Sequence, residues 1–261
     1  MTTRITIAGA DFSANAVGFI PPVADGLLGW FYLGGTIAET QRDRAGIADG
    51  VLAGNPTISA GYVTFSGYSS GQRMQTSIVE TANITLLTVA RSSDAFAAGA
   101  TKPMFLSNYG ADPGNSNLLI GASLYVEGGT PPAMLVRMGG GQNNNGTIQG
   151  QVNTNITTAD GTGWNFYAGS MAATSSNTAA TGNARKLYNS TTDQSHTTSN
   201  YPRVPHTVNT FRVGAAYNAN FSGFCDVAFA AIYNRVLSDA EVETIYQAVK
   251  ARLAAKHSIT I

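Results

Sequence analysis

The sequence FSGFCDVAFAAIYNRVLSDAEV, residues 221–242, holds the strand and the helix start that decide the fold. Residues 223–233 are mostly apolar and aromatic, a composition that predicts a β-strand. Soon after it, Ser238 and Glu241 form an S-x-x-E capping box, and the apolar side chains of residues 238–253 share one helical face. The sequence therefore predicts a strand that leads into one late amphipathic helix, which caps the fold.

Upstream of this stretch, the chain consists of short β-type runs separated by polar, Gly-rich and Asn-rich segments. The predicted strands cover residues 61–65, 84–90, 104–106, 118–126, 133–138, 163–168, 185–188 and 210–214. No amphipathic helical pattern lies between these runs, which argues against a parallel βαβ arrangement. The expected fold class is all-β, an antiparallel β-sandwich (jelly roll) with one C-terminal α-helix.

The composition limits the partners that the chain is able to attract. Charged residues make up only 11% of the chain, and 15 Lys and Arg balance 15 Asp and Glu, so neither nucleic acid nor insertion into a membrane is expected. The most apolar N-terminal stretch is interrupted by Pro21, Pro22 and Asp25 and predicts no membrane-spanning helix. The lone Cys225 excludes an intrachain disulfide and is expected to be a buried, unreactive thiol.

One domain is expected over residues 27–261, because the chain shows no repeat and no charged linker. Residues 1–26 are predicted to be an opening segment or an assembly arm of this domain. Residues 1–5 carry no apolar run of the kind that starts a secretory signal. Synthesis in a cytoplasm without a signal peptide is therefore expected.

Several motifs follow one another in an order that is seen in a known family. FRVG at residues 211–214 matches that family's R-I-G strand, and residues 221–242 match its motif F-x-G-x-I-D-D-V-R-I-Y-N-R-A-L-S-D-A-E-I. Where the family has a D-G pair, this chain has Asn189 and Ser190, and a Ser/Thr-rich insertion covers residues 172–181. Further matches are DRAG at 43–46, GYVTF at 61–65, GWNFYA at 163–168 and KLYN at 186–189.

On these motifs the chain resembles the laminin G-like branch of the concanavalin A-like lectin and glucanase superfamily, over most of its length. The resemblance implies a jelly roll. It implies no single activity, because this fold serves glycan binding, hydrolysis, adhesion and scaffolding.

The sequence lacks the acid pair with which glucanases of this superfamily cleave glycosidic bonds. Their two carboxylates stand on one strand, in an E-x-D-x-x-E or E-x-D-x-E arrangement that is absent here. Only Glu127 ends a predicted strand, and it has no acidic partner within four residues. The protein is therefore predicted not to be an enzyme. The five glutamates are Glu39, Glu80, Glu127, Glu241 and Glu243.

GYSSG at residues 67–71 matches the G-x-S-x-G pattern of a nucleophile elbow. Such an elbow leads from a strand of a parallel sheet into a helix, whereas residues 72–77 carry no apolar helical stripe. We therefore interpret the motif as a turn between two strands.

No cofactor is expected, and calcium is the one metal ion with any support. Asp112, Asn115 and Asn117 supply oxygen ligands of the kind that calcium prefers. The sequence DPGN at residues 112–115 is also an ordinary β-turn, which is the favoured interpretation. The histidines lack the spacing of zinc ligands and are expected in loops or at the surface. They are His196, His206 and His257.

The leading prediction is a non-enzymatic, lectin-like protein that contacts a bacterial surface polysaccharide. Neutral sugars are held by amide and hydroxyl hydrogen bonds and by aromatic faces, which this chain supplies in its long polar stretches. These stretches, residues 107–117, 139–147 and 189–203, are expected to be loops. The predicted ligand-binding residues are Tyr109, Asp112, Asn115, Asn117, Gln142, Asn143, Asn144, Asn145, Asp193, His196 and Tyr201.

A second resemblance concerns where the protein acts. Residues 5–13 and the Asn/Thr/Gly-rich body are similar to bacteriophage virion and tail-associated proteins, which implies a place in a virion and contacts with other virion proteins. The alternative function is a structural phage particle protein, a tail or decoration component, whose jelly roll serves assembly only. A homo-oligomer is expected under either hypothesis, because a closed symmetric assembly is the usual outcome when a chain pairs with itself.

Asp226 is predicted to be structural. Strict alternation along the strand places it on the face opposite Cys225 and Val227, where an acid needs a basic partner. The predicted partners are Arg212 and Arg235.

Overall fold

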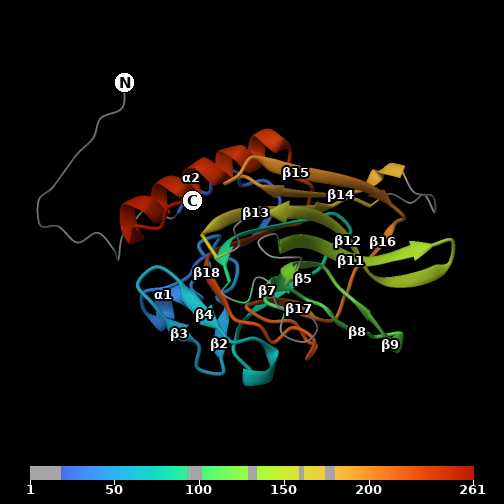
Figure 1. Cartoon of the computed structure of the whole chain (residues 1–261), viewed down its shortest axis with the longest axis horizontal. Coiled ribbons are helices and arrows are strands. Elements are labelled where there is room, and N and C mark those ends of the chain that lie inside the picture. Colours follow the sequence, from blue (N-terminus) through green and yellow to red (C-terminus); the bar gives the residue numbers. More distant parts are fainter. Residues whose placement is uncertain (1–18, 93, 95–101, 129–133, 159–161, 174–179) are drawn as a thin grey trace, which may run out of the picture.

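Two eight-stranded antiparallel sheets pack face to face in the computed structural model (Figure 1). This arrangement confirms the predicted antiparallel β-sandwich with one long C-terminal helix. In the described part of the chain, no helix is long and apolar enough to cross a membrane. The structure describes residues 19–92, 94, 102–128, 134–158, 162–173 and 180–261.

The first sheet is built around the strand that was predicted over residues 223–233. Its order is β15 (Gln194–Asn200), β14 (Ala180–Asn189), β13 (Asn165–Met171), β6 (Ile84–Arg91), β18 (Cys225–Tyr233), β4 (Val63–Phe65) and β3 (Thr57–Ile58), and β1 (Leu27–Tyr32) also pairs with β18. β18 pairs with β6 along one side and with both β4 and β1 along the other. It is therefore the central strand of this sheet.

The second sheet packs against the inner face of the first sheet. Its order is β12 (Thr147–Thr158), β11 (Met134–Asn144), β10 (Ser123–Gly128), β7 (Met104–Ser107), β17 (Thr210–Val213), β5 (Arg73–Val79) and β2 (Val51–Ala53), and β16 (Arg203–Val204) pairs with β11. The remaining elements are α1 (Ile37–Gln41), the 3-10 helix η1 (Tyr68–Ser70), the hairpin of β8 (Gly110–Asp112) and β9 (Asn115–Ile120), and α2 (Asp239–His257).

The space between the sheets is filled by side chains that alternate along the strands. Phe65, Leu86 and Val227 reach into it from the first sheet, and Leu124 from the second. Cys225 belongs to the same core, is a free thiol, and has its pKa raised by burial. The prediction that this thiol is buried is confirmed, and its lack of reactivity stays a prediction.

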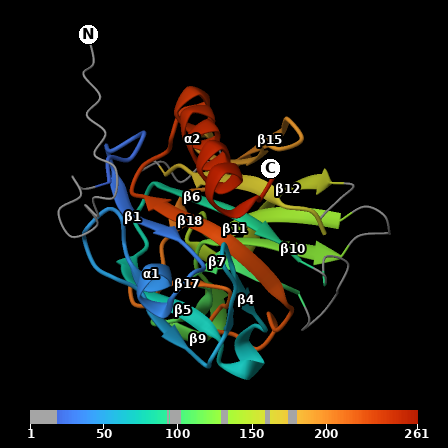
Figure 2. The same ribbon diagram turned by 90° about the vertical axis from the view of Figure 1, so that its left-hand side faces the viewer.

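Helix α2 covers the outer face of the first sheet, above β6 and β18 (Figure 2). Its buried side chains share one face, as the sequence predicted, and they pack against Trp30, Phe166 and Phe229 of the sheet. The first sheet is thus buried on both faces, and the molecule has three layers. The buried helix residues are Val242, Ile245, Tyr246, Val249 and Leu253.

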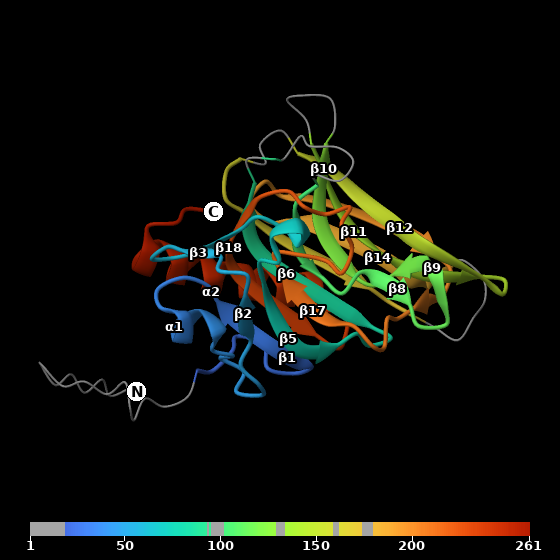
Figure 3. The same ribbon diagram turned by 90° about the horizontal axis from the view of Figure 1, so that it is seen from below.

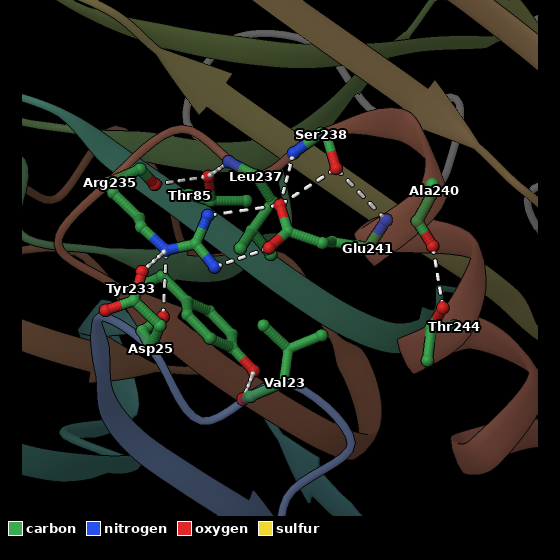
Figure 4. Close-up of polar contacts among 10 residues, drawn as sticks. All are labelled: Val23, Asp25, Thr85, Tyr233, Arg235, Leu237, Ser238, Ala240, Glu241 and Thr244. Carbon is green, nitrogen blue, oxygen red and sulfur yellow. Dashed lines mark hydrogen bonds and ion pairs between the residues drawn. The ribbon is translucent and has the colours of Figure 1, made fainter.

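The start of α2 is fixed by the predicted capping box (Figure 4). The backbone N–H of Glu241 donates to the Ser238 hydroxyl at 3.3 Å, and the Ser238 N–H donates to the Glu241 carboxylate at 2.8 Å. Arg235, just after β18, donates to the same carboxylate at 2.6 Å. The helix end is therefore bound both to its own backbone and to the end of the central strand.

This contact makes the stability of the fold sensitive to acid. The hydrogen bond from Arg235 is the largest of the causes that lower the pKa of Glu241 to about 2, from an ordinary value of 4.5. Because the folded pKa lies below the unfolded one, the carboxylate stabilises the fold fully above about pH 5, and this contribution is lost as the pH falls towards 2. We expect the difference in melting temperature between the wild type and Glu241→Gln to shrink over this range. Thermal unfolding at pH 7, 4 and 2 measures it, and a constant difference would contradict the assignment.

The three long polar stretches form hairpins, so the prediction of loops was wrong there. β11 continues to Asn144, and the chain turns back into β12 at Asn145 and Gly146. Their φ angles are 49° and 91°, as a type I′ hairpin turn requires. The Thr- and Asn-rich composition of these strands concealed them. The other two stretches contain the β8–β9 and β14–β15 hairpins, and Figure 3 shows β8 and β9 at the end of the sandwich away from α1.

Asp226 forms its ion pair with Arg91, so the predicted partners Arg212 and Arg235 were wrong. Arg91 Nε lies 2.8 Å from one carboxylate oxygen, and the Thr64 hydroxyl donates to the other at 2.6 Å. Both partners stand directly opposite Asp226 in the strands that flank β18. These strands are far apart in sequence, so the sheet pairing determines the contact. The carboxylate joins adjacent strands, which is the role that was expected of Asp226.

The described part of the predicted opening segment, residues 19–26, lies against the sandwich. The ring of Phe19 packs against Trp30 with centroids 5.2 Å apart, and Tyr233 donates to the Val23 carbonyl at 2.8 Å. Residues 1–18, and residues 174–179 of the Ser/Thr-rich insertion, lie outside the described residues. The assembly arm and the boundary between residues 26 and 27 stay predictions.

Candidate functional site

A surface pocket of about 470 Å³ lies where η1 meets the outer face of the second sheet. We call it the arginine pocket, because two arginine side chains, from β5 and β17, line it. The complete lining is Tyr68, Ser69, Ser70, Gly71, Arg73, Arg212, Ala215, Ala216 and Tyr217.

One wall of the arginine pocket is the GYSSG motif of residues 67–71. It forms η1, a single 3-10 turn between β4 and β5, which confirms the interpretation as a turn between strands. Gly67 has a φ of 71°, and a Cβ there would lie 2.6 Å from the backbone of Ser222, so only glycine fits. The Ser70 hydroxyl donates to the Gly67 carbonyl at 2.8 Å, which closes the turn. The side chain of Tyr68 is left 40% exposed at the mouth of the pocket.

Arg212, on the opposite wall, is held in a fixed orientation. Its neighbours Phe211 and Val213 point into the core, so alternation directs Arg212 outward. Its Nε donates to Gln75 at 2.7 Å, and Nη1 donates to the Ala216 carbonyl at 3.0 Å. The guanidinium lies 3.3 Å from the ring centroid of Tyr217, a cation–π contact.

Arg73 supplies the second positive charge. Its Nη1 donates to the Gly71 carbonyl at 2.9 Å, and its Nε is buried without a hydrogen-bond partner in the described part of the chain. Burial lowers the pKa of Arg212, and the nearby charge of Arg73 lowers it further, yet a guanidinium stays charged at neutral pH. No ion pair between described residues includes either arginine. The pocket thus offers donors and aromatic faces to a ligand rich in acceptor groups.

The residues predicted to bind ligand lie elsewhere, and not all in one place. Asp112 and Asn115 line a second pocket, of about 540 Å³, between the β8–β9 hairpin and the start of β12. Tyr109 is buried, with its ring edge-on to Phe221 at 5.4 Å. Asn117 is exposed on β9. The β8–β9 hairpin therefore presents acid and amide groups but no exposed aromatic ring from Tyr109.

The Asp112 and Asn115 side chains fold back onto their own hairpin. Asp112 accepts from the Gly114 N–H at 2.9 Å, and Asn115 accepts from the Asn117 N–H at 3.2 Å. These are the hydrogen bonds of Asx turns. They accompany a turn at residues 112–115, the interpretation that the sequence favoured over a calcium site. Among the described residues, no three His, Cys, Asp or Glu side chains are grouped so that they could hold a metal ion.

The predicted amide cluster lies at the end of β11 and in the turn that leads into β12. Gln142 is buried and donates to Gln149 across the hairpin, and Asn143 accepts from the Gly146 N–H at 2.7 Å. Asn144 and Asn145 complete the turn. Gln142 and Asn143 therefore stabilise the hairpin, and the role of the four amides towards a ligand stays a prediction.

Asp193, His196 and Tyr201 lie on or beside the β14–β15 hairpin. Asp193 lines a third pocket of about 400 Å³, which also contains Asp239 and Glu243 of α2. The His196 ring lies 3.3 Å from the Thr154 hydroxyl of β12, and Tyr201 is half-buried after β15. The structure thus does not bring the predicted residues into a single site.

His206 lies in the loop between β16 and β17, as expected, and its side chain is buried there. Its Nε2 lies 2.8 Å from the Ala111 carbonyl, and its Nδ1 accepts from the Asn209 N–H at 3.0 Å. Both ring nitrogens are engaged by the backbone, so His206 joins two chain segments.

Sequence reasoning missed the arginine pocket although both of its motifs were noticed. FRVG was interpreted as a strand and GYSSG as a turn, and both interpretations hold. The pairing of β17 with β5, which places Arg212 opposite Gln75, is what brings the two motifs together. That pairing joins residues 137 positions apart, and no local pattern in the chain signals it.

The fold of this chain is similar to that of several solved receptor-binding and ligand-binding domains of toxins. The receptor binding domain of botulinum neurotoxin D aligns with a TM-score of 0.56 at 11% identity, covering 88% of this chain and 54% of that chain. The binding domain of Paraclostridial Mosquitocidal Protein 1 aligns with a TM-score of 0.53 at 15% identity, covering 87% and 53%. The botulinum neurotoxin serotype D ligand binding domain in complex with N-acetylneuraminic acid aligns at 0.56 and 12%, covering 87% and 52%.

These similarities show the fold alone, since the identities are low. The chain spans about half the length of the structures that it matches. The neighbours are named as receptor-binding or ligand-binding domains rather than as enzymes. No protein-family model matches the sequence, and no curated protein matches it.

Proposed function

We propose that the protein binds carbohydrate in the arginine pocket and catalyses no reaction. The observation that carries the proposal is a concave site with an exposed aromatic ring, Tyr68, facing outward-directed guanidinium groups. Sugar rings stack their C–H faces on aromatic rings, and their hydroxyl oxygens accept hydrogen bonds from fixed donors. Arg212 is such a donor, because Gln75, Ala216 and Tyr217 hold it before any ligand arrives.

Two further observations support binding without catalysis. One structural neighbour, the botulinum neurotoxin serotype D ligand binding domain, is described in complex with N-acetylneuraminic acid, a sugar. Glu127, the one acid that ends a predicted strand, is paired with Arg137 at 2.8 Å and with Lys102 at 3.4 Å. A carboxylate held in this way is poorly placed to donate or accept the protons of glycoside cleavage.

Replacement of Tyr68 with Ala tests the proposal. The substitution removes the aromatic face, and we expect the affinity for glycans bound by the wild type to fall at least about tenfold. Phe224→Ala is the matched control, because Phe224 is also an exposed ring, at 50%, but lines a different pocket. The measurement is a glycan array followed by titration calorimetry. If Tyr68→Ala bound as the wild type does, or if the wild type bound no glycan, the proposal would be wrong.

We further propose a bacterial surface polysaccharide as the ligand and a virion as the location. The support is the resemblance of the sequence to bacteriophage virion and tail-associated proteins, and residues 5–13 of that resemblance lie outside the described residues. Mass spectrometry of purified particles from the source culture tests the location, and absence of the chain from all particles would exclude it.

One observation supports the alternative function, a protein that serves assembly only. Ile47 and Val79 are exposed apolar residues that line a shallow pocket of about 250 Å³ beside Leu28 and Ile78. Contact between copies of the chain would bury such residues. Native mass spectrometry distinguishes the two functions in combination with the glycan array: an oligomer that binds no glycan favours assembly.

A further inference from the structure

We propose that the saccharide bound in the arginine pocket carries a carboxylate, and that Arg73 and Arg212 bind this group together. The inference rests on the proposed function and adds the class of ligand to it. An acidic sugar differs from its neutral counterpart by the charged carboxylate, so an experiment can test this inference separately from the proposed function.

The charge of the pocket carries the inference. Four arginines of the described chain are ion-paired: Arg91 with Asp226, Arg137 with Glu127, Arg203 with Glu80, and Arg235 with Asp25 and Glu241. The other described arginines form no ion pair with a described residue, and Arg73 and Arg212 are the two of them that line the arginine pocket. Arg73 and Arg212 share one pocket, and no carboxylate residue lines it.

Two like charges repel each other, and an anion bound between them offsets this repulsion. Arg73 and Arg212 are close enough to interact: burial lowers the pKa of Arg212, and the charge of Arg73 lowers it further. The chain as a whole has a formal net charge of zero, whereas two arginines and no acidic residue line this pocket. A bound carboxylate would offset the positive charge of the pocket.

The hydrogen bonds left open point to the same ligand. Among the described residues, Arg212 uses Nε and Nη1, which leaves Nη2 for a ligand. Arg73 uses Nη1, which leaves Nη2 for a ligand. A carboxylate oxygen is the strongest acceptor for a guanidinium.

Two other pockets among the described residues do not offer this chemistry. The pocket beside the β14–β15 hairpin is lined by Asp193, Asp239 and Glu243, and the one beside the β8–β9 hairpin contains Asp112. Both would repel a carboxylate. Of these three pockets, the arginine pocket is the one suited to an acidic sugar.

The test compares Arg73→Gln with the wild type on a glycan array that contains acidic and neutral members. The best acidic glycan is then titrated beside its methyl ester, which has the same rings without the charge. We expect Arg73→Gln to lower the affinity for the acid by about 10- to 100-fold and to change that for the ester less than threefold. Affinity of the wild type for the acid should also fall as salt increases.

Arg42→Gln is the matched control, because it removes one exposed positive charge outside the pocket. We expect it to bind as the wild type does. Arg73→Lys keeps the charge without the fork of donors and should give an intermediate affinity. The melting temperature of each variant verifies folding.

The outcomes separate the two proposals. Binding of neutral glycans only, with loss in Tyr68→Ala, would overturn the acidic ligand and leave carbohydrate binding in place. Equal binding of an acidic glycan by Arg73→Gln and the wild type would also overturn the role of Arg73. Binding of no glycan by the wild type would overturn both proposals.

Discussion

Glu80→Ala is expected to lower the free energy of unfolding by about 3–5 kcal/mol. Glu80 is buried directly after β5 and forms an ion pair with Arg203, which is also buried. Its other carboxylate oxygen accepts from Asn108 Nδ2 at 2.9 Å and from the N–H groups of Ala122 and His206, both at 3.0 Å. Removal of the carboxylate leaves a buried cation and three buried donors without their partner.

The size of this effect follows from where the four partners lie. They stand at the ends of β7, β10 and β16, so one carboxylate joins segments that are distant in sequence. Urea unfolding measures the loss. Glu243→Ala is the control, because Glu243 is exposed and only accepts from Gln247 along α2, so its loss should stay within about 0.5 kcal/mol.

A double-mutant cycle with Arg203→Met tests the assignment of the effect to the ion pair. With the cation also removed, the Glu80→Ala substitution should destabilise less than it does alone. A loss below about 1 kcal/mol for Glu80→Ala in the wild-type background would contradict the buried pair.

Arg185→Ala is expected to destabilise the fold by about 2–4 kcal/mol. Arg185 lies on β14 of the first sheet, is 1% exposed, and crosses to the second sheet. There it donates to the carbonyls of Gly140 at 3.0 Å and Gly141 at 3.3 Å on β11, and to the carbonyl of Val152 on β12. The register of β11 and β12 shifts just after Gly140, so Arg185 satisfies carbonyls at this irregularity.

The substitution leaves these carbonyls unpaired and opens a cavity between the sheets. Burial lowers the pKa of Arg185 to about 10, so the side chain is charged at neutral pH and its hydrogen bonds are charge-assisted. Chemical denaturation measures the effect, with the exposed Arg42→Ala as control. Arg185→Lys should recover part of the stability, and equal stability of Arg185→Ala and the wild type would show that the bridge is unimportant.

The elements with strong local signals could be predicted from the sequence. The apolar run around Val227 and the S-x-x-E box at Ser238 each determine their own structure, and both elements form as expected. β12 and β15 were missed because Thr, Asn, Ser and Gln dominate them. Their place is decided by pairing with the preceding strand across a tight turn, and Asn145–Gly146 was the one local signal for it.

The candidate site could not be predicted in the same way. Polar stretches draw attention as binding loops, yet here many of their side chains close turns, as Asp112 and Asn143 do. The arginine pocket depends on which strands are neighbours, and so do the ion pairs of Asp226 and Glu80. Such contacts join residues that are distant in sequence. They depend on the order of the strands in the sheets, and no short stretch of sequence indicates that order.

A crystal structure of the protein with a bound glycan tests the central claim most directly. The account predicts the sugar in the arginine pocket, with a ring against Tyr68 and an acidic group at Arg73 and Arg212. A glycan bound instead at Asp112 and Asn115, or beside Asp193, with the arginine pocket empty, would contradict it.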